Sequence, residues 1–360
     1  MNIGGIANYI LSLSGAFRDK GAEVLIASSG GNLEDELKKI GITNKHLDIK
    51  TKFEFSPKVL KSAFILSKII RDAKVDIVHA HTRVSQVSAL LASRMTKVPL
   101  VTTCHGFFKK RSRGVFDTWG VKVIAISDAV KSHLIDDLGL KKERIEVIYS
   151  GIDAGRFLND YPEEDKDRIK KELALKDGPV IGTIGRLSPV KGQKFLIHAL
   201  KEIISKQPDV QALIIGDGPE EGVLRNLAKS LEIADSVHFF ASSLDTHKFL
   251  SVMDVFIFPS IKEGLGMALL EAMASGKACV ASDIGGIGNI MKSGANGVLV
   301  EVGDTTGISD AILILLQDAE LRERIGQNAR ALVKEKFSLL RWADEVMRFY
   351  ERVLRDRVKA

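Results

Sequence analysis

Short β-rich runs alternate with helical patterns along almost the whole chain, and this alternation limits the folds open to it. Each run of the first half is followed by a loop and usually by a segment of helical periodicity, as at residues 128–138. These runs lie at residues 23–28, 75–80, 100–104, 121–126 and 145–149. Because a strand, a crossover helix and the next strand form a βαβ unit, the pattern predicts a parallel sheet covered by helices.

The same pattern starts again after a charged stretch at residues 159–176 that contains Pro162. Strands are expected at residues 180–184, 211–215, 237–240, 255–258 and 278–282, with helices such as 193–205, 267–275 and 304–316 between them. A chain of 360 residues exceeds the usual size of one domain. We therefore predict an α/β protein with one Rossmann-like domain in residues 1–159, a second in residues 160–337, and a final amphipathic helix in residues 338–360.

Charge is unevenly distributed between the two halves. Residues 1–150 contain 24 Lys and Arg against 15 Asp and Glu, whereas the whole chain has a net charge of only +6. A cluster at Lys109, Lys110, Arg111 and Arg113 concentrates the excess. It suits an anionic partner, such as a membrane surface, a lipid-linked phosphate or an acidic saccharide, but a solvated loop with no partner is an equal alternative. Nucleic acid is not expected as a partner.

Cysteine content and hydropathy bear on the cellular compartment. The only cysteines, Cys104 and Cys279, each lie inside an apolar run, which favours reduced, buried thiols over a disulfide or a metal cluster. No apolar run is long enough for a membrane span, and the N-terminus lacks the pattern of a signal peptide. These features predict a cytoplasmic protein.

The most informative segment is residues 258–276. A buried strand ends at Pro259, a loop with two glycines follows, and a helix begins near Gly266. The carboxyl end of a parallel strand is where open α/β sheets bind ligands, and the start of a helix offers N–H groups to a diphosphate. Glu263 in the loop and Glu271 on the second helical turn have seven residues between them, so they can hold one extended ligand at two places.

Two further loops of the second half carry polar groups or glycines after a strand. Arg186 and Lys191 follow the strand at 180–184 and could neutralise a diphosphate as it leaves. Gly216 opens a Gly-Asp-Gly-Pro turn after the next strand, and by itself this could be a plain turn.

In the first half, His105 stands at the carboxyl tip of the strand at 100–104. His79 and His81 alternate along another strand and face one side, which would permit a metal, but no third ligand is apparent and we favour a role in lining the ligand cleft. Gly4 and Gly5 open directly into a helical pattern, so the strand that normally precedes such a glycine turn is absent.

Together these motifs closely resemble those of the retaining glycosyltransferases of family 4, and the resemblance covers nearly the whole chain. The family implies a B-type fold, in which two Rossmann-like domains face each other across a cleft and the final helix crosses back to the first domain. By resemblance, Glu263 contacts the donor sugar, Glu271 the nucleotide ribose, and His105 the sugar from across the cleft. The implied catalytic residues are His105, Arg186, Lys191 and Glu263; the implied donor-binding residues are Gly5, Gly185, Gly216, Gly264, Leu265, Gly266, Met267, Ala268 and Glu271; and Gly4 and His81 lie on the acceptor side.

The resemblance implies a metal-independent hexosyl or N-acetylhexosaminyl transferase that uses a nucleotide sugar as substrate and needs no cofactor. A UDP-sugar is favoured over a GDP-sugar, and the acceptor is expected to be a glycan or glycolipid of the cell envelope, of the lipopolysaccharide type. The enzyme would then work in the cytoplasm or at the inner face of the membrane. Two alternatives stay open: a non-catalytic nucleotide-sugar-binding protein, and a dinucleotide-dependent oxidoreductase, for which no convincing Gly-x-Gly-x-x-Gly turn is found.

Overall fold

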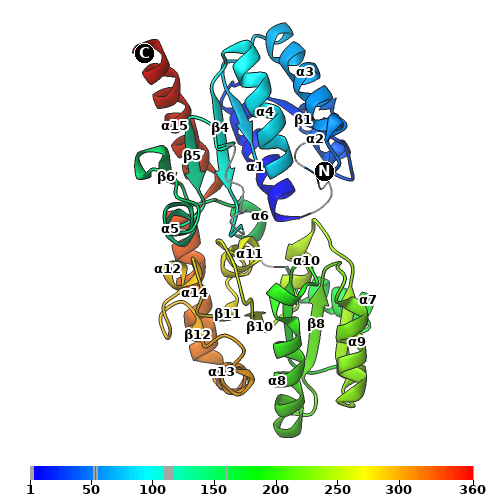
Figure 1. Cartoon of the computed structure of the whole chain (residues 1–360). Helices are drawn as coiled ribbons and strands as arrows, with labels where there is room; N and C mark the ends of the chain where they lie inside the picture. The colour runs from blue at the N-terminus through cyan, green and yellow to red at the C-terminus, as the bar shows by residue number, and fades with distance from the viewer. Residues whose placement is uncertain (1–3, 52, 54–55, 109–116, 159–160, 360) are drawn as a thin grey trace. The chain divides into compact units, whose positions relative to one another are not determined.

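A computed structural model describes residues 4–51, 53, 56–108, 117–158 and 161–359 of the protein. The chain divides into two compact units. Unit 1 is made of residues 1–151 and 339–360, and unit 2 of residues 152–338. The first division therefore falls a few residues before the boundary expected at 159, and the chain returns to unit 1 for its last helix (Figure 1).

Unit 2 is built on one parallel sheet whose strand order is β12-β11-β10-β7-β8-β9. Its strands are β7 (Val180–Ile184), β8 (Gln211–Ile215), β9 (Val237–Phe240), β10 (Val255–Phe258), β11 (Ala278–Ser282) and β12 (Val298–Val300). Its helices are α6 (Gly155–Leu158), α7 (Glu163–Glu172), α8 (Gln193–Lys206), α9 (Glu221–Ser230), α10 (Thr246–Ser251), α11 (Met267–Ala274), α12 (Ile287–Ile290), α13 (Thr305–Gln317) and α14 (Ala319–Lys336). The first and fourth strands of the unit, β7 and β10, are neighbours, so the order reverses between them. This is the topological switch point, where doubly wound sheets bind their ligands.

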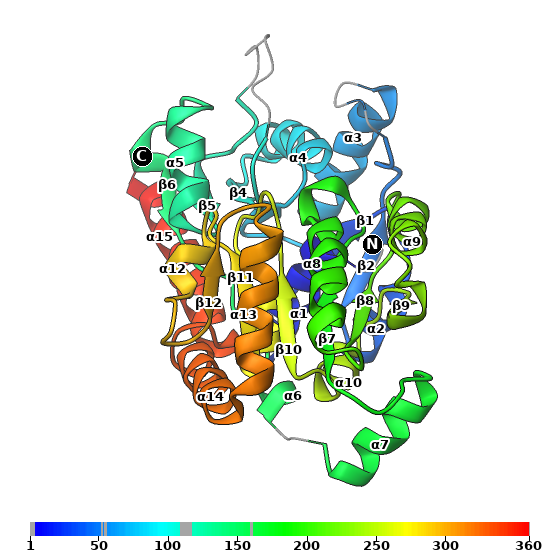
Figure 2. The same cartoon turned by 90° about the horizontal axis from the view of Figure 1, so that it is seen from below.

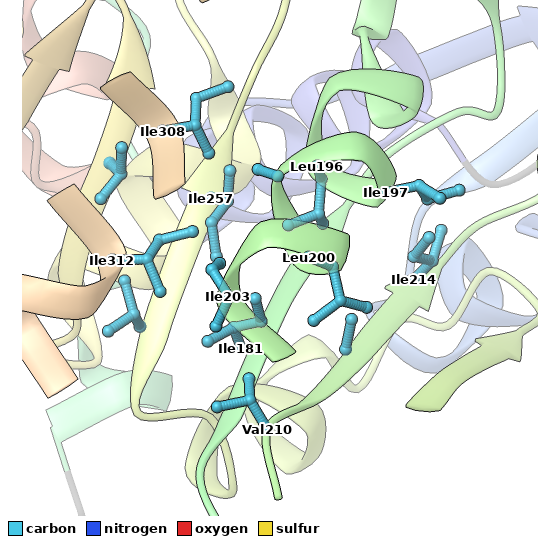
Figure 3. Close-up of a cluster of buried hydrophobic side chains, with 14 of the residues drawn as sticks. Ile181, Leu196, Ile197, Leu200, Ile203, Val210, Ile214, Ile257, Ile308 and Ile312 are labelled. Carbon is cyan, nitrogen blue, oxygen red and sulfur yellow. The ribbon is translucent and has the colours of Figure 1, made fainter. Parts of the chain in front are cut away.

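Aliphatic side chains hold this sheet against its helices. Ile181 on β7 and Ile257 on β10 lie in one buried cluster with Leu196 and Leu200 of α8 and Ile312 of α13 (Figure 3). Helices α8 and α13 lie side by side over the sheet (Figure 2). Each fully buried Leu or Ile side chain contributes about 1.5–3 kcal/mol relative to exposure, so the strands form a firm base for the loops at their carboxyl ends.

Unit 1 has two separate parallel sheets in its described residues, β1-β2 and β3-β4-β5-β6. Its strands are β1 (Leu25–Ser28), β2 (Thr43–His46), β3 (Val78–Ala80), β4 (Leu100–Cys104), β5 (Lys122–Ala125) and β6 (Ile145–Val147). Its helices are α1 (Gly5–Asp19), α2 (Glu34–Lys39), α3 (Pro57–Asp72), α4 (Arg83–Thr96), α5 (Asp128–Asp136) and α15 (Leu339–Lys359). All ten strands expected from the sequence are present, several of them shorter than predicted, whereas β2 and β12 were not expected.

The strands of unit 1 form two sheets, whereas those of unit 2 form one. In unit 2 the first strand, β7, lies between β8 and β10. If β1 of unit 1 is matched with β8 and β3 with β10, the place of β7 lies between β1 and β3. No described strand occupies that place. The first described element of unit 1 is α1, which begins at Gly5.

The last helix, α15, packs on α1 within unit 1. Trp342, Val346 and Phe349 of α15 are buried, and Asp344 forms an ion pair with Lys20 at 2.6 Å. The helical spacing of these apolar residues is the reason that α15 has one face to bury. None of the helices in the described part of the chain combines the length and hydropathy needed to cross a bilayer.

Candidate functional site

The loops that follow β7 and β10 are joined at the switch point of unit 2. The backbone N–H of Ile261 donates to the carbonyl of Val190 at 2.8 Å. Gly192 has a φ of 67°, and a Cβ added there would lie 1.9 Å from the carbonyl oxygen of Pro259. Only glycine fits this close approach without strain, so the two loops hold a fixed relation to each other.

Lys191 and Glu263, predicted separately from two motifs, form an ion pair across these loops. Their side chains are 26% and 15% exposed, and the Lys191 ammonium lies 5.6 Å from the centre of the Phe258 ring. A partly buried pair keeps more of its electrostatic interaction than a solvated one, because water screens it less. The pair places one donor group and one acceptor group at the carboxyl ends of adjacent strands.

Arg186 lies on the same loop as Lys191 but has different surroundings. Its side chain is exposed, and it makes no ion pair with any residue that the structure describes. Its backbone is held, because Gln193 Nε2 donates to the Arg186 carbonyl at 3.0 Å. Arg186 is therefore a solvated cation on an anchored backbone.

The loop after β8 crosses the start of the Arg186 loop. The N–H of Gly185 donates to Ile215 O at 2.9 Å, and the N–H of Leu187 donates to Asp217 O at 3.0 Å. Gly216 lies between these two bonds and itself donates to Phe240 O at 2.9 Å, at the end of β9. The predicted glycines thus stand where the backbones of three loops come close together.

The start of α11 follows directly on the Glu263 loop. Gly264, Leu265 and Gly266 are buried, whereas Met267 and Ala268 are partly exposed. Gly266 is the N-cap with a φ of 91°, and it has no side chain to bond the first N–H groups of the helix. Such uncapped N–H groups, at the positive end of the helix dipole, suit a phosphate or another anion.

Glu271 has its own partners and does not share those of Glu263. Burial raises the pKa of the Glu271 carboxyl to about 7, while a hydrogen bond with Thr246 and the charge of Arg156 act in the opposite direction. A carboxyl group with this pKa is part protonated at neutral pH, so it can both donate and accept hydrogen bonds. The two glutamates of the motif therefore occupy two chemically different places.

In unit 1, His81 and His105 meet at the carboxyl edge of the β3-β4-β5-β6 sheet. Each follows directly on a strand, His81 on β3 and His105 on β4, and these strands are neighbours. Nδ1 of His81 lies 3.2 Å from Nε2 of His105. Burial lowers the pKa of His81 to about 3. Burial, and then the charge of His81, lower the pKa of His105 well below its usual value. Both rings are therefore neutral at pH 7, and one donates to the other.

His79 lies beside this pair in a network that the sequence did not reveal. Its Nδ1 lies 2.6 Å from the Tyr350 hydroxyl and its Nε2 lies 2.7 Å from Thr103 Oγ1. The Tyr9 hydroxyl lies 3.4 Å from the same Thr103 oxygen. Among the described residues, no group of three or more histidine, cysteine or carboxylate side chains is arranged to hold a metal.

Aromatic rings from both terminal helices enclose the histidines. The ring of Tyr9, on α1, packs edge-on against His105, with 4.6 Å between the centres, and also against Trp342 of α15 at 4.4 Å. The chain has only four tyrosines and two tryptophans, and half of these six residues contact the three histidines or each other here. That concentration of rare residues is the signal in the sequence, but it becomes visible only once α1 and α15 are known to lie together.

The remaining predicted residues of unit 1 are placed as follows. Gly4 is the N-cap of α1 and Gly5 is its first residue, so both lie about one helical turn before Tyr9. Both glycines are exposed. The basic cluster at Lys109, Lys110, Arg111 and Arg113 lies outside the described residues.

Comparison with known proteins identifies the family. Residues 3–156 match the model described as Glycosyltransferase Family 4, and residues 165–332 match the model described as Glycosyl transferases group 1. The N-acetyl-alpha-D-glucosaminyl L-malate synthase of Bacillus anthracis is 30% identical over 84% of this chain and 82% of its own length. The UDP-Gal:alpha-D-GlcNAc-diphosphoundecaprenol alpha-1,3-galactosyltransferase of Escherichia coli is 28% identical over 81% of this chain and 79% of its own length.

Solved structures agree on the fold. A glycosyltransferase from Rickettsia africae has a TM-score of 0.85 at 24% identity and covers 98% of this chain and 97% of its own. The Anabaena HepE protein, solved in complex with UDP-glucose, has the same TM-score and identity and covers 97% of this chain and 96% of its own. Because matched family models cover most of the chain and a relative with 30% identity aligns over more than two thirds of both sequences, this protein belongs to the family 4 glycosyltransferases, with two Rossmann-like domains.

Proposed function

We propose that this glycosyltransferase moves a hexosyl or N-acetylhexosaminyl group from a nucleotide diphosphate sugar to an acceptor hydroxyl, with retention of the anomeric configuration. The observation that carries the proposal is the ion pair between Lys191 and Glu263 at the β7/β10 switch point, next to the uncapped start of α11. Bound donor would take up both groups: its diphosphate would accept hydrogen bonds from Lys191, and its sugar hydroxyls would donate to Glu263.

The reaction needs positive charge where the diphosphate leaves. Lys191, Arg186 and the N–H groups of α11 can supply it, and we propose that they act without a divalent metal or a cofactor. In the proposed step the bond from C1 to the phosphate oxygen breaks, and the bond from C1 to the acceptor oxygen forms on the same face. The acceptor proton passes to the departing diphosphate oxygen.

The other donor contacts follow the placement of the predicted residues. We propose that the carboxylate form of Glu271 accepts hydrogen bonds from the ribose hydroxyls, and that His105 of unit 1 contacts the donor sugar as a neutral imidazole. Gly185, Gly216 and Gly264 to Ala268 would offer backbone groups to the diphosphate and sugar, as would Gly5. Gly4 and His81 belong to the acceptor side.

Relatives guide the choice of donor and acceptor. The printed name of the E. coli relative specifies UDP-Gal as donor and a diphosphoundecaprenol-linked sugar as acceptor, and relatives from two mycobacteria are named phosphatidyl-myo-inositol mannosyltransferases. We propose a UDP-sugar in preference to a GDP-sugar, and a lipid-linked glycan or glycolipid of the cell envelope as acceptor. An enzyme that uses such an acceptor would act at the inner face of the membrane. The net positive charge of the first 150 residues suits an anionic surface there.

Calorimetric titration with UDP and GDP tests the donor site directly. Lys191→Ala should weaken UDP binding by about 10- to 100-fold, since charge-assisted hydrogen bonds contribute roughly 1.5–3 kcal/mol. Lys194→Ala is the matched control, because Lys194 lies three residues away on an exposed part of α8 and should leave binding unchanged.

Turnover of a panel of UDP-hexoses and UDP-N-acetylhexosamines then tests the reaction, with and without EDTA. NMR of the product anomer tests retention. Undiminished UDP affinity in Lys191→Ala would refute the site assignment, and turnover that is lost in EDTA would refute metal independence.

A further inference from the structure

Arg156 is an exposed cation close to the donor-site candidates of unit 2, and no sequence motif singled it out. It lies on α6, which packs on α11, the helix that carries Glu271 (Figure 1). Its Nη2 donates to the carbonyl of Leu244 at 3.1 Å, although the two residues are 88 positions apart in the sequence. Arg156 forms no ion pair with any residue that the structure describes. The Leu244 carbonyl thus holds the guanidinium in place without neutralising its charge.

Leu244 belongs to the loop that joins β9 to α10, residues 241–245. The residue that follows this loop, Thr246, is buried and forms a hydrogen bond with Glu271. The helix that begins with Thr246, α10, also packs on α11. One short stretch of backbone therefore holds the Arg156 guanidinium at one residue and the Glu271 carboxyl group two residues later.

The ionisation of Glu271 depends on these neighbours. Burial raises the pKa of its carboxyl group to about 7, and the hydrogen bond with Thr246 and then the charge of Arg156 lower that pKa. Near the pKa of a group, a small change in its surroundings produces a large change in its ionised fraction. A cation beside Glu271 therefore controls how much carboxylate is present at neutral pH.

Other charged groups on the elements that pack against α11 are engaged elsewhere. Arg330 of α14 donates to two carbonyls at the C-terminal end of α11. Lys248 of α10 pairs with Glu172, and the His247 ring packs against the Phe157 ring with 5.5 Å between the centres. Strands β10 and β11 carry no charged side chain. The guanidinium on α6 is the cation best placed to act on the carboxyl group.

We propose that Arg156 is a positioning residue of the donor site: the Leu244 carbonyl holds its guanidinium where the positive charge stabilises the carboxylate of Glu271. In this form Glu271 accepts hydrogen bonds from the ribose hydroxyls, so Arg156 acts through Glu271 and does not itself touch the nucleotide. The inference rests on the proposed function in one respect, which is the contact of Glu271 with the ribose.

Carbon-13 NMR of the full chain, labelled at its glutamate carboxyl carbons, follows the ionisation of Glu271 in the absence of UDP. The Glu271 signal is the one that is missing in Glu271→Gln. In Arg156→Gln its titration midpoint should rise by about 0.5 pH unit or more, a modest shift because the guanidinium is exposed. In Arg156→Lys, which keeps the charge, the midpoint should stay close to the wild-type value.

Arg324→Gln is the matched control for the NMR titration. Arg324 is exposed on α14, and its charge is not among the causes that shift the pKa of Glu271. This variant should therefore leave the midpoint of Glu271 unchanged. An unchanged midpoint in Arg156→Gln as well, or an equal rise in the two variants, would overturn the proposal.

Calorimetric titration with UDP at pH 7 and pH 9 tests the consequence for the donor. At pH 7 the higher midpoint leaves less carboxylate in Arg156→Gln, so UDP affinity should fall about twofold or more. At pH 9 Glu271 is ionised in both proteins, and their affinities should be equal. An equal fall at both pH values, or an equal fall when Glu271→Gln is already present, would overturn the proposal, because Arg156 would then contact UDP or support the fold.

The two measurements keep this proposal distinguishable from the proposed function. A rise of the Glu271 midpoint in Arg156→Gln, with no UDP binding by wild type, would refute the donor site and leave the link between the two residues intact. UDP binding by wild type with no rise of the midpoint would refute the role of Arg156 alone.

Discussion

The Tyr350 hydroxyl lies 2.6 Å from Nδ1 of His79, and so joins the last helix of the chain to the histidines at the edge of the unit 1 sheet. Burial, together with the charges of His81 and His105, lowers the pKa of His79 well below its usual value, so the ring is neutral at pH 7. A neutral imidazole has one donor and one acceptor nitrogen, and Tyr350 and Thr103 occupy both. The C-terminal helix therefore completes the hydrogen bonding of a residue far away in the sequence.

We expect Tyr350→Phe to destabilise the protein by about 1–3 kcal/mol, because it leaves Nδ1 of the buried His79 without a partner. Urea unfolding measures the change. Tyr149→Phe serves as the control, since its hydroxyl donates to Asp128 at an exposed position and its loss should cost less than about 0.5 kcal/mol. An equal loss of unfolding free energy in the two variants would show that the hydrogen bond to His79 stabilises the protein no more than an exposed one does.

The His81–His105 pair should make the protein less stable in acid. The pKa of His81 in the folded protein is about 3, below the value of about 6.5 in an unfolded chain. Between these two values the unfolded state binds more protons, so stability is fully present above pH 6.5 and falls as the pH falls toward 3. The slope approaches about 1.4 kcal/mol per pH unit for each histidine that must stay neutral.

Unfolding measured against pH for wild type and His81→Gln isolates this effect, because other titrating groups are common to both proteins. The difference in unfolding free energy between them should change across this window and stay constant above pH 7. A constant difference throughout would mean that His81 is free to take up a proton in the folded state.

Glu271 should make UDP binding depend on pH near neutrality. Burial raises its pKa to about 7, so the carboxylate that accepts ribose hydroxyl hydrogen bonds becomes dominant only as the pH rises through this value. UDP affinity should therefore increase from pH 6 to pH 8, by up to about tenfold for a charge-assisted bond. The terminal phosphate of UDP also titrates, with a pKa of about 6, so calorimetry compares wild type with Glu271→Gln, whose UDP affinity should rise less over this range. An equal rise in the two proteins would assign the titration to UDP or to another group.

Gly192→Ala should weaken both the fold and the donor site. The added Cβ would lie 1.9 Å from Pro259 O at a φ of 67°, so the Lys191 loop and the Glu263 loop must move apart, at a cost of more than about 1 kcal/mol. Thermal unfolding and UDP titration should both show the loss.

Gly222→Ala is the matched control for this substitution. Gly222 lies in α9 with nothing within 4 Å of its added Cβ, and alanine there should stabilise the helix by up to about 1 kcal/mol. If Gly192→Ala likewise keeps its thermal stability and its UDP affinity, the close approach of the two loops is not needed for the fold or for the donor site.

Local patterns were enough to predict the strands and the long helices. The runs at 180–184, 211–215 and 278–282 coincide with β7, β8 and β11, because fully buried parallel strands appear as continuous apolar runs. The strand β2, Thr43–His46, was missed, since it is polar and mostly exposed. Of the predicted site residues, Lys191 and Glu263 were assigned to different contacts, and their mutual ion pair could not be seen in either motif alone.

Hydrophobic periodicity and glycine placement determined the class of fold, the two-domain plan and the loops that carry the donor-site candidates, because these depend on neighbours in the sequence. The tertiary structure alone decided the pairing of Lys191 with Glu263, the separate surroundings of Glu271, and the bond from Tyr350 to His79. Each of these joins segments that are distant in the sequence. Such contacts depend on strand order and on which helix faces meet, and no local pattern encodes either.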